Sequence, residues 1–236
     1  MSGHEALRRV ALALADRAHE VVFVGGAVLP LLITDPAAEA PRRTLDVDCV
    51  VEVVNQADYG RFCAHVRACG FEPMPEGGVI CRYRKDDLVL DVMPQHPAML
   101  GFTNRWYPEA VASAADYALD AHVRVRVVTA PVFVATKIEA FRGRGSDFLT
   151  SEDVEDIVAV VEGRPSFCAE VETATVAVRQ CLADTFASWL GNAEYADALA
   201  GHLPGDAGSQ GRIEDVIARM RQVIACRPSD HHPSAG

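Results

Sequence analysis

The sequence predicts an α+β fold, in which a mixed β-sheet flanked by helices is followed by a C-terminal helical domain. Three observations predict it. Apolar runs of strand length alternate with helical patterns in the first half, a hairpin signal at 85–87 joins two of them, and only helical patterns follow residue 129. The 236 residues, 50% of them hydrophobic, are enough to bury a core. We therefore expect a mixed α/β domain at 1–128, a helical domain at 129–226 and a disordered tail at 227–236.

Glycine and proline set the element bounds in the first half. Gly25 and Gly26 end a buried strand, the stretch 35–43 is a loop rich in proline, alanine and charge, and Gly70 is expected to cap a helix. The predicted elements, in chain order, are helix 4–18, strand 20–24, helix 27–33, strand 44–53, helix 56–69, a hairpin of strands 79–84 and 88–93, and strand 122–128.

Helix-start signals recur in the second half. Pro131 stands near the first turn of a helix, where its missing N–H is tolerated. Ser151 is a typical N-cap, and the acidic residues after it are well placed at the positive end of a helix. We expect helices at 131–144, from about 151, at 166–190, at 192–201 and at 210–225.

Composition and charge exclude several classes of protein. The net charge of −11 argues against indiscriminate binding to nucleic acid or to an anionic membrane, although a local basic patch could still hold RNA. No apolar run is long enough to span a bilayer, and the N-terminus lacks a signal-peptide core. The seven cysteines lack metal-ligand spacing and indicate reduced thiols. We therefore expect a cytoplasmic protein without a membrane partner.

Aspartates interrupt two apolar strands. Asp46 and Asp48 share one strand face because alternate side chains point the same way. Adjacent carboxylates repel each other, and a divalent cation such as Mg²⁺ would relieve that repulsion. Asp91 lies in the apolar run 88–93, and if that strand neighbours the first, the three carboxylates could surround one or two cations. The alternative is a solvent-facing strand edge without a metal.

Two further groups could hold phosphate. Glycines between a strand and a helix let backbone N–H groups approach an anion, although an isolated pair such as Gly25 and Gly26 is more often a simple tight turn. Lys137 and Arg144 fall on one face of the 131–144 helix, where the lysine either extends from the core or reaches into a cleft. With Asp153 and Asp156 they predict either an ion-pair network or a triphosphate clamp.

The pattern Gly25-Gly26 followed by Arg42-x-Thr44-x-Asp46-x-Asp48 resembles the signature of the DNA polymerase β-type nucleotidyltransferase superfamily. Its Arg-x-Thr-x-Asp-x-Asp form is similar to the AbiEii/MenT group, the nucleotidyltransferase toxins of type IV toxin–antitoxin systems. The later stretch from Lys137 to Arg144, followed by Asp153 and Asp156, resembles the lysine-containing helix of that group and the acidic helix after it. The resemblance covers about residues 20–165, and the last part of the chain matches nothing.

The resemblance implies a nucleotidyltransferase-type sheet, a catalytic core at 1–128 and a Mg²⁺-dependent reaction. A nucleoside monophosphate would pass from an NTP to an acceptor, most often RNA such as the 3′ end of tRNA, and a cognate antitoxin would restrain the enzyme. The implied roles are metal binding by Asp46, Asp48 and Asp91, nucleotide binding by Gly25, Gly26, Arg42, Thr44, Lys137 and Arg144, and catalysis by Asp46, Asp48, Lys137 and Asp153. Asp156, one turn after Asp153, is an alternative for the last of these.

The resemblance also gives Thr44 a regulatory meaning, because some relatives are phosphorylated at this position by the antitoxin. A phosphate there would add about two negative charges beside the metal carboxylates. The acceptor stays open. Arg82, Arg84 and Lys85 on the hairpin could contact RNA, whereas an acidic cleft would suit an aminoglycoside, and a protein side chain is a further acceptor. A non-catalytic nucleotide-binding module is the alternative from a different class.

Overall fold

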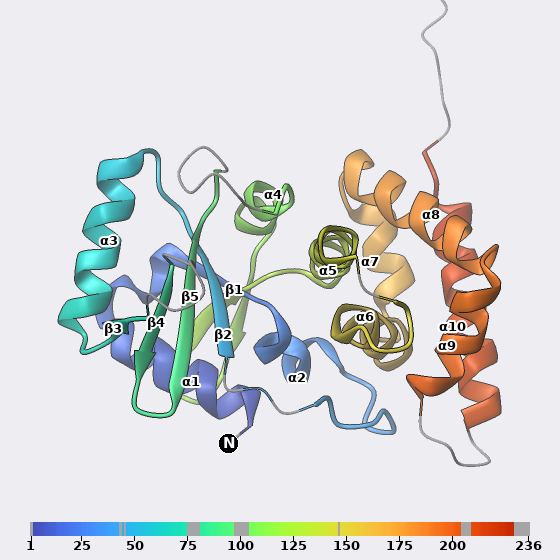
Figure 1. The fold of residues 1–236 in the computed structure, drawn as a ribbon, viewed down its shortest axis with the longest axis horizontal. Coiled ribbons are helices and arrows are strands. Elements are labelled where there is room, and N and C mark those ends of the chain that lie inside the picture. The colour runs from blue at the N-terminus through green and yellow to red at the C-terminus, as the bar shows by residue number, and fades with distance from the viewer. Residues whose placement is uncertain are drawn as a thin grey trace, which may run out of the picture.

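The structure is a computed structural model that describes residues 2–42, 44, 46–74, 81–96, 104–145, 147–203 and 209–228. Within these residues the chain forms a seven-stranded sheet and ten α-helices. Figure 1 shows the sheet with α1 (Gly3–Leu14) and α3 (Gln56–Ala68) on one side of the molecule. The helices from α5 (Ala130–Arg144) to α10 (Ser209–Ala225) lie on the other side. The expected α+β fold is confirmed.

The sheet is mixed, with the strand order β3-β4-β5-β2-β1-β7-β6. Its central strand β2 runs antiparallel to β1 and parallel to β5, whereas β4 and β5 form the predicted antiparallel hairpin. The described strands are β1 (Val21–Val24), β2 (Asp46–Val51), β3 (Glu72–Pro73), β4 (Arg82–Lys85), β5 (Leu88–Pro94), β6 (Ala115–Ala118) and β7 (Arg124–Val127). Part of the predicted strand 79–84 lies outside the described residues.

Local conformation changes two of the predicted elements in the first half. The first helix ends at Leu14, where Ala15 has φ 53°, and a 3₁₀ helix, η1 (Ala15–Glu20), follows it. The predicted helix 27–33 is a 3₁₀ turn, η2 (Gly26–Val28), followed by the short α2 (Leu29–Leu32). Gly70, with φ +88°, follows the end of α3 as expected. Three elements have no counterpart among the predicted ones: α4 (Tyr107–Ala112) and the edge strands β3 and β6.

The second half contains only helices among its described residues. The prediction of one helix over 166–190 was wrong, because Ala174 and Thr175 adopt extended ψ angles of 163° and 153° and split it. The helices after α5 are α6 (Glu152–Gly163), α7 (Phe167–Thr173), α8 (Val176–Leu190), α9 (Ala193–Gly201) and α10. Most of the predicted tail, from residue 229 on, lies outside the described residues.

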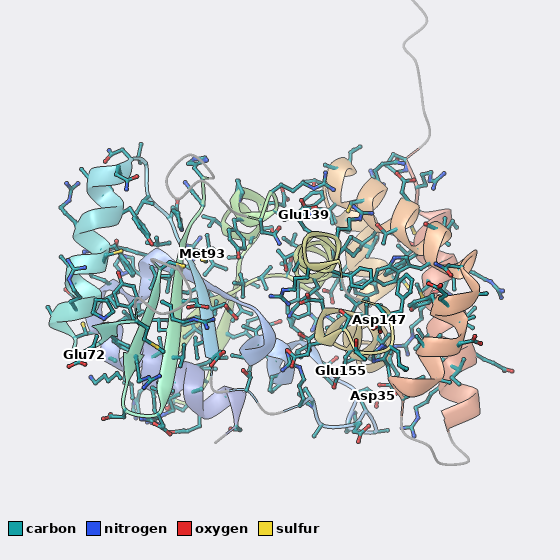
Figure 2. The ribbon with its side chains drawn as sticks, viewed as in Figure 1. Asp35, Glu72, Met93, Glu139, Asp147 and Glu155 are labelled. Carbon is teal, nitrogen blue, oxygen red and sulfur yellow. The ribbon has the colours of Figure 1, made fainter. Side chains whose placement is uncertain are left out.

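One hydrophobic cluster joins the sheet to the helices. It includes Phe23 on β1 and Phe133 on α5, both fully buried, together with Ile157 on α6. Contacts also connect α4 with α5 and α2 with α6. Side chains drawn in Figure 2 occupy the space between the sheet and helices α5 and α6. This packing fixes α5 and α6 relative to the strand ends.

The N-cap residue Ser151 stabilises the start of α6, the helix that carries Asp153 and Asp156. Ser151 is 5% exposed, and its Oγ accepts a hydrogen bond from the backbone N–H of Val154 at 3.3 Å. We expect Ser151→Ala to lower the free energy of unfolding by about 1 kcal/mol, because the N–H loses its partner. Ser188→Ala, at an exposed helical position, is the control and should change it by less than about 0.5 kcal/mol. Equal stability of both variants in urea unfolding would contradict the capping role.

Candidate functional site

The register of the central strands brings the predicted aspartates together. Asp48 on β2 pairs with Asp91 on β5 and, on its other side, with Val24 at the end of β1. Asp46 lies two residues from Asp48 on the same face and is exposed, opposite Val89. The strand that carries Asp91 therefore neighbours the strand that carries Asp48, as a three-carboxylate cluster requires.

Gly25 lies against the carboxylate of Asp48. Its φ is +69°, a conformation that side chains of L-residues rarely adopt. A Cβ atom on Gly25 would fall 1.9 Å from Asp48 Oδ2, so only glycine allows both the turn and the carboxylate in this arrangement. At Gly26 the nearest atoms to such a Cβ are 3.5 Å away or more, which is ordinary contact. The glycine pair is thus asymmetric, and Gly25 is the residue that the site requires.

Asp48 is a costly anion. Burial, and secondarily the nearby charge of Asp91, raise the pKa of the Asp48 carboxyl to about 6. Among the described residues, no hydrogen bond or ion pair reaches its carboxylate. The protein therefore keeps the destabilising carboxylate of Asp48 on β2, next to the end of β1 and beside Gly25, which leaves space for it. This is the pattern expected of a group retained for binding or chemistry.

Asp91, by contrast, is already paired. Arg82 on β4, opposite Asp91 in the register, donates from Nε to Oδ1 at 2.8 Å and from Nη2 to Oδ2 at 2.7 Å. This bond to Asp91 raises the pKa of the Arg82 guanidinium. From the sequence alone Arg82 is expected only as an RNA contact, because its position across the strand from Asp91 depends on the hairpin register.

The carboxylates suit a hard cation only in part. Asp46 and Asp48 supply oxygen donors without a described basic partner, and such donors match Mg²⁺. Within the described ranges, no group of three or more histidine, cysteine, aspartate or glutamate side chains is placed to hold a metal. The arrangement therefore fits a pair of metal-binding carboxylates, Asp46 and Asp48, with Asp91 beside them and bound to Arg82.

Lys137 on α5 lies between two buried carboxylates of α6. Its Nζ is 2.5 Å from Asp156 Oδ2 and 3.1 Å from Asp153 Oδ1. Arg144 Nη1 contacts the other oxygen of Asp153 at 2.6 Å. Burial opposes the charge on Lys137, but Asp156 and Asp153 outweigh it and raise the pKa of the ammonium. The predicted ion-pair network is confirmed, and the lysine is a fixed cation.

Arg42 and Thr44 lie next to this network. Arg42 contacts Asp156 at 3.4 Å and Glu152 at 3.1 Å, so it joins the loop before β2 to α6. Thr44 Oγ1 accepts a hydrogen bond from the backbone N–H of Asp46 at 3.2 Å. Arg42 and Thr44 are also the nearest residues to the open side of Gly26.

A single cleft connects the sheet with the helices. Gly25 and Asp48 line it from the strand ends, and Lys137, Arg144 and Asp153 line it from α5 and α6. It encloses about 90 Å³, room for roughly three water molecules. Asp156, 1% exposed, is not among the described residues that line the cleft, so Asp153 is the acid that faces it. Residues that the sequence did not indicate complete the lining: Val24, Asn104, Tyr107, Thr136 and Ala140.

The missed residues gave no sequence signal. Asn104 and Tyr107 lie in or beside a short helix without apolar periodicity, and their place in the cleft depends on packing of α4 against α5. The Asn104 side chain donates to the backbone oxygen of Thr136 at 2.7 Å, which holds this segment on α5. The pKa of Tyr107 is raised by burial and by the nearby Asp48.

The asymmetry of the glycine pair is testable. We expect Gly25→Ala to lower the free energy of unfolding by at least about 2 kcal/mol, because the methyl group meets Asp48 and φ is positive. Gly26→Ala should cost less than about 1 kcal/mol, since its contacts are ordinary. Chemical denaturation of both variants measures the difference. A harmless Gly25→Ala would show that Asp48 is not held against this turn.

The raised pKa of Asp48 predicts a pH dependence of stability in metal-free buffer. The folded protein binds the Asp48 proton up to a pH of about 6, whereas the unfolded chain releases it near 3.8. This group's contribution to stability therefore falls as pH rises through that window. Asp48→Asn should raise the free energy of unfolding by about 3 kcal/mol at pH 7 and by much less at pH 4. An equal effect at both pH values would contradict the raised pKa.

No protein-family profile matches the chain, and no curated protein matches its sequence. Among solved structures, a proposed nucleotidyltransferase from H. pylori overlaps with a TM-score of 0.45 and 12% sequence identity, covering 95% of this chain and 94% of that one. Similarity at this level transfers neither residue roles nor an activity to this chain, so the assignment depends on the site itself.

Proposed function

We propose that the protein is a Mg²⁺-dependent nucleotidyltransferase that moves a nucleoside monophosphate from an NTP to an acceptor hydroxyl. One observation carries the proposal: a single cleft contains the Gly25 turn and Asp48 from the sheet and Lys137 and Arg144 from α5. Segments more than 80 residues apart in the sequence thus supply a glycine turn, carboxylates and fixed cations to one place. Together these groups suit a nucleoside triphosphate with its cation.

The charges in the cleft favour the metal complex of the nucleotide over the free nucleotide. Lys137 and Arg144 are balanced by Asp48 and Asp153, so the cleft has no excess of positive charge for a bare triphosphate. A cation that arrives with the phosphates would relieve Asp48, the carboxylate without a described partner. Binding of the nucleotide and of the cation should therefore support each other.

The residues divide the task. Asp46 and Asp48 would hold Mg²⁺, which, when bound, neutralises phosphate charge and makes an acceptor hydroxyl more acidic. The turn at Gly25 and Gly26 would offer backbone N–H groups to the phosphates. Lys137, fixed by Asp153 and Asp156, places a positive charge where negative charge develops during transfer. Arg144 and Arg42 add donors on the α6 side.

We further propose RNA as the acceptor and a toxin role of the AbiEii/MenT kind, with the 3′ end of tRNA as the first acceptor to test. The support is the sequence resemblance. Of its motif residues, the following line the cleft: Gly25, Asp48, Lys137, Arg144 and Asp153. Thr44, bonded to the backbone of Asp46, lies where a phosphate added by a cognate antitoxin would act on the carboxylates. No helix in the described part of the chain is long and apolar enough to cross a membrane.

A cationic small molecule is the second candidate acceptor. The chain carries a net charge of −11, and Arg82, which lies across the strands from Asp91, is already paired with that carboxylate. An aminoglycoside or another cation would meet less repulsion here than RNA. Transfer to RNA in a direct competition would exclude this candidate.

Nucleotide transfer is the direct test. Incubation with each α-labelled NTP, Mg²⁺ and total RNA should label a discrete RNA band. Asp46→Asn and Asp48→Asn should lower transfer at least about 100-fold, because each removes a charged metal ligand. Ser188→Ala, on an exposed face of α8, is the control and should retain full transfer.

The other outcomes separate the alternatives. Label on an aminoglycoside or on protein, with none on RNA, would change the acceptor and keep the reaction. Tight binding of Mg·NTP without transfer to any acceptor would favour the non-catalytic module. Undiminished transfer by Asp48→Asn would contradict the proposed chemistry.

A further inference from the structure

Three strands place Arg82, Asp91 and Asp48 in one row across the sheet. In the register, Arg82 on β4 is opposite Asp91 on β5, which is opposite Asp48 on β2. Paired positions on adjacent strands point to the same face, so the guanidinium, one carboxylate and the next carboxylate follow one another. Asp46 and Arg84 lie on this same face, two residues along their strands.

The first pair in the row is strong. Asp91 is 8% exposed, and Arg82 binds both of its oxygens, at 2.8 and 2.7 Å. A bidentate guanidinium–carboxylate pair is charge-assisted and fixes the orientation of both groups. Asp91 thus has an internal cation, and Asp48 beside it has no described basic partner.

This arrangement has a consequence for metal binding. A carboxylate whose two oxygens both accept from a guanidinium has less charge and fewer lone pairs left for a divalent cation. The cation site then consists of Asp46 and Asp48 alone, in agreement with the lack of a three-ligand group among the described residues. The affinity of carboxylate sites for such cations rises with the number of charged ligands.

We propose that Arg82 competes with the divalent cation for Asp91 and thereby sets the metal affinity of the site. The three-carboxylate site forms only when the guanidinium releases Asp91, so the nucleotide-free protein binds the cation weakly. Arg82 acts through Asp91 and is a positioning residue. The inference depends on the proposed function only for the identity of the cation.

Mn²⁺ binding to the nucleotide-free full-length protein tests the proposal. Electron paramagnetic resonance reports free Mn²⁺ and needs no catalytic activity. Arg82→Gln should tighten Mn²⁺ binding roughly tenfold, because it frees Asp91 as a third charged ligand. Arg84→Gln is the matched control, because it removes the same charge from the same strand face and leaves the Arg82–Asp91 pair intact. Its Mn²⁺ affinity should stay within about twofold of wild type.

A double variant isolates the route. Arg82→Gln combined with Asp91→Asn should return the Mn²⁺ affinity to about the wild-type value, because the freed ligand is gone. If the affinity of Arg82→Gln is unchanged or weaker, or if no variant binds Mn²⁺, the proposal is overturned. Equal tightening by Arg84→Gln would also overturn it, since net charge alone would then explain the effect.

Two further measurements keep the result unambiguous. Thermal unfolding by circular dichroism verifies that Arg82→Gln folds, and if it does not, Arg82→Lys replaces it. Lysine keeps the charge but cannot form the two-pronged bond, so Arg82→Lys should tighten Mn²⁺ binding by a smaller factor, and no tightening would overturn the proposal. Transfer of labelled nucleotide is measured separately. If Arg82→Gln binds Mn²⁺ more tightly but neither wild type nor any variant transfers nucleotide, the proposed function is refuted and this inference is retained. If nucleotide is transferred but Arg82→Gln does not tighten Mn²⁺ binding, this inference alone is refuted.

Discussion

The position of β2 in the sheet is the constraint on which the site depends. Because β2 pairs antiparallel with β1 and parallel with β5, Asp48 lies beside both the end of β1, where the Gly25 turn begins, and Asp91. A shift of this register by one residue would turn Asp46 and Asp48 to the opposite face and bring Val47 into the cleft. The buried neighbours Val47 and Cys49 oppose such a shift, so the hydrophobic core of the sheet also determines the geometry of the carboxylates.

The helical side of the cleft is held together by buried ion pairs. Lys137, Asp153 and Asp156 are nearly excluded from water, and each is acceptable there only because the others compensate its charge. The network holds α5 on α6, and Arg42 extends it to the loop before β2. The cluster thus joins the two sides of the cleft. Loss of one member would leave a buried charge without a partner, so a substitution in the cluster should be strongly destabilising.

Sequence patterns predicted which charged residues would lie close together better than they predicted the contacts around them. Asp46, Asp48, Asp91 and Lys137 were recognisable because charged residues are rare in apolar strands and on apolar helix faces. Pairing across strands was not recognisable: the contact of Arg82 with Asp91 depends on the hairpin register, and the place of Tyr107 depends on tertiary packing. The break at Ala174 was also missed, because no proline or glycine stands there and the β-branched Thr173 and Thr175 are only a weak signal against a helix.

The central claim is that the Gly25 turn, Asp48 and Lys137 form one triphosphate site across the sheet and α5. A crystal structure with Mg²⁺ and a non-hydrolysable NTP analogue tests it most directly. We expect the triphosphate between the Gly25 turn and Lys137, with the cation on Asp46 and Asp48. A nucleotide bound away from this cleft, or a cation that contacts neither aspartate, would contradict the account.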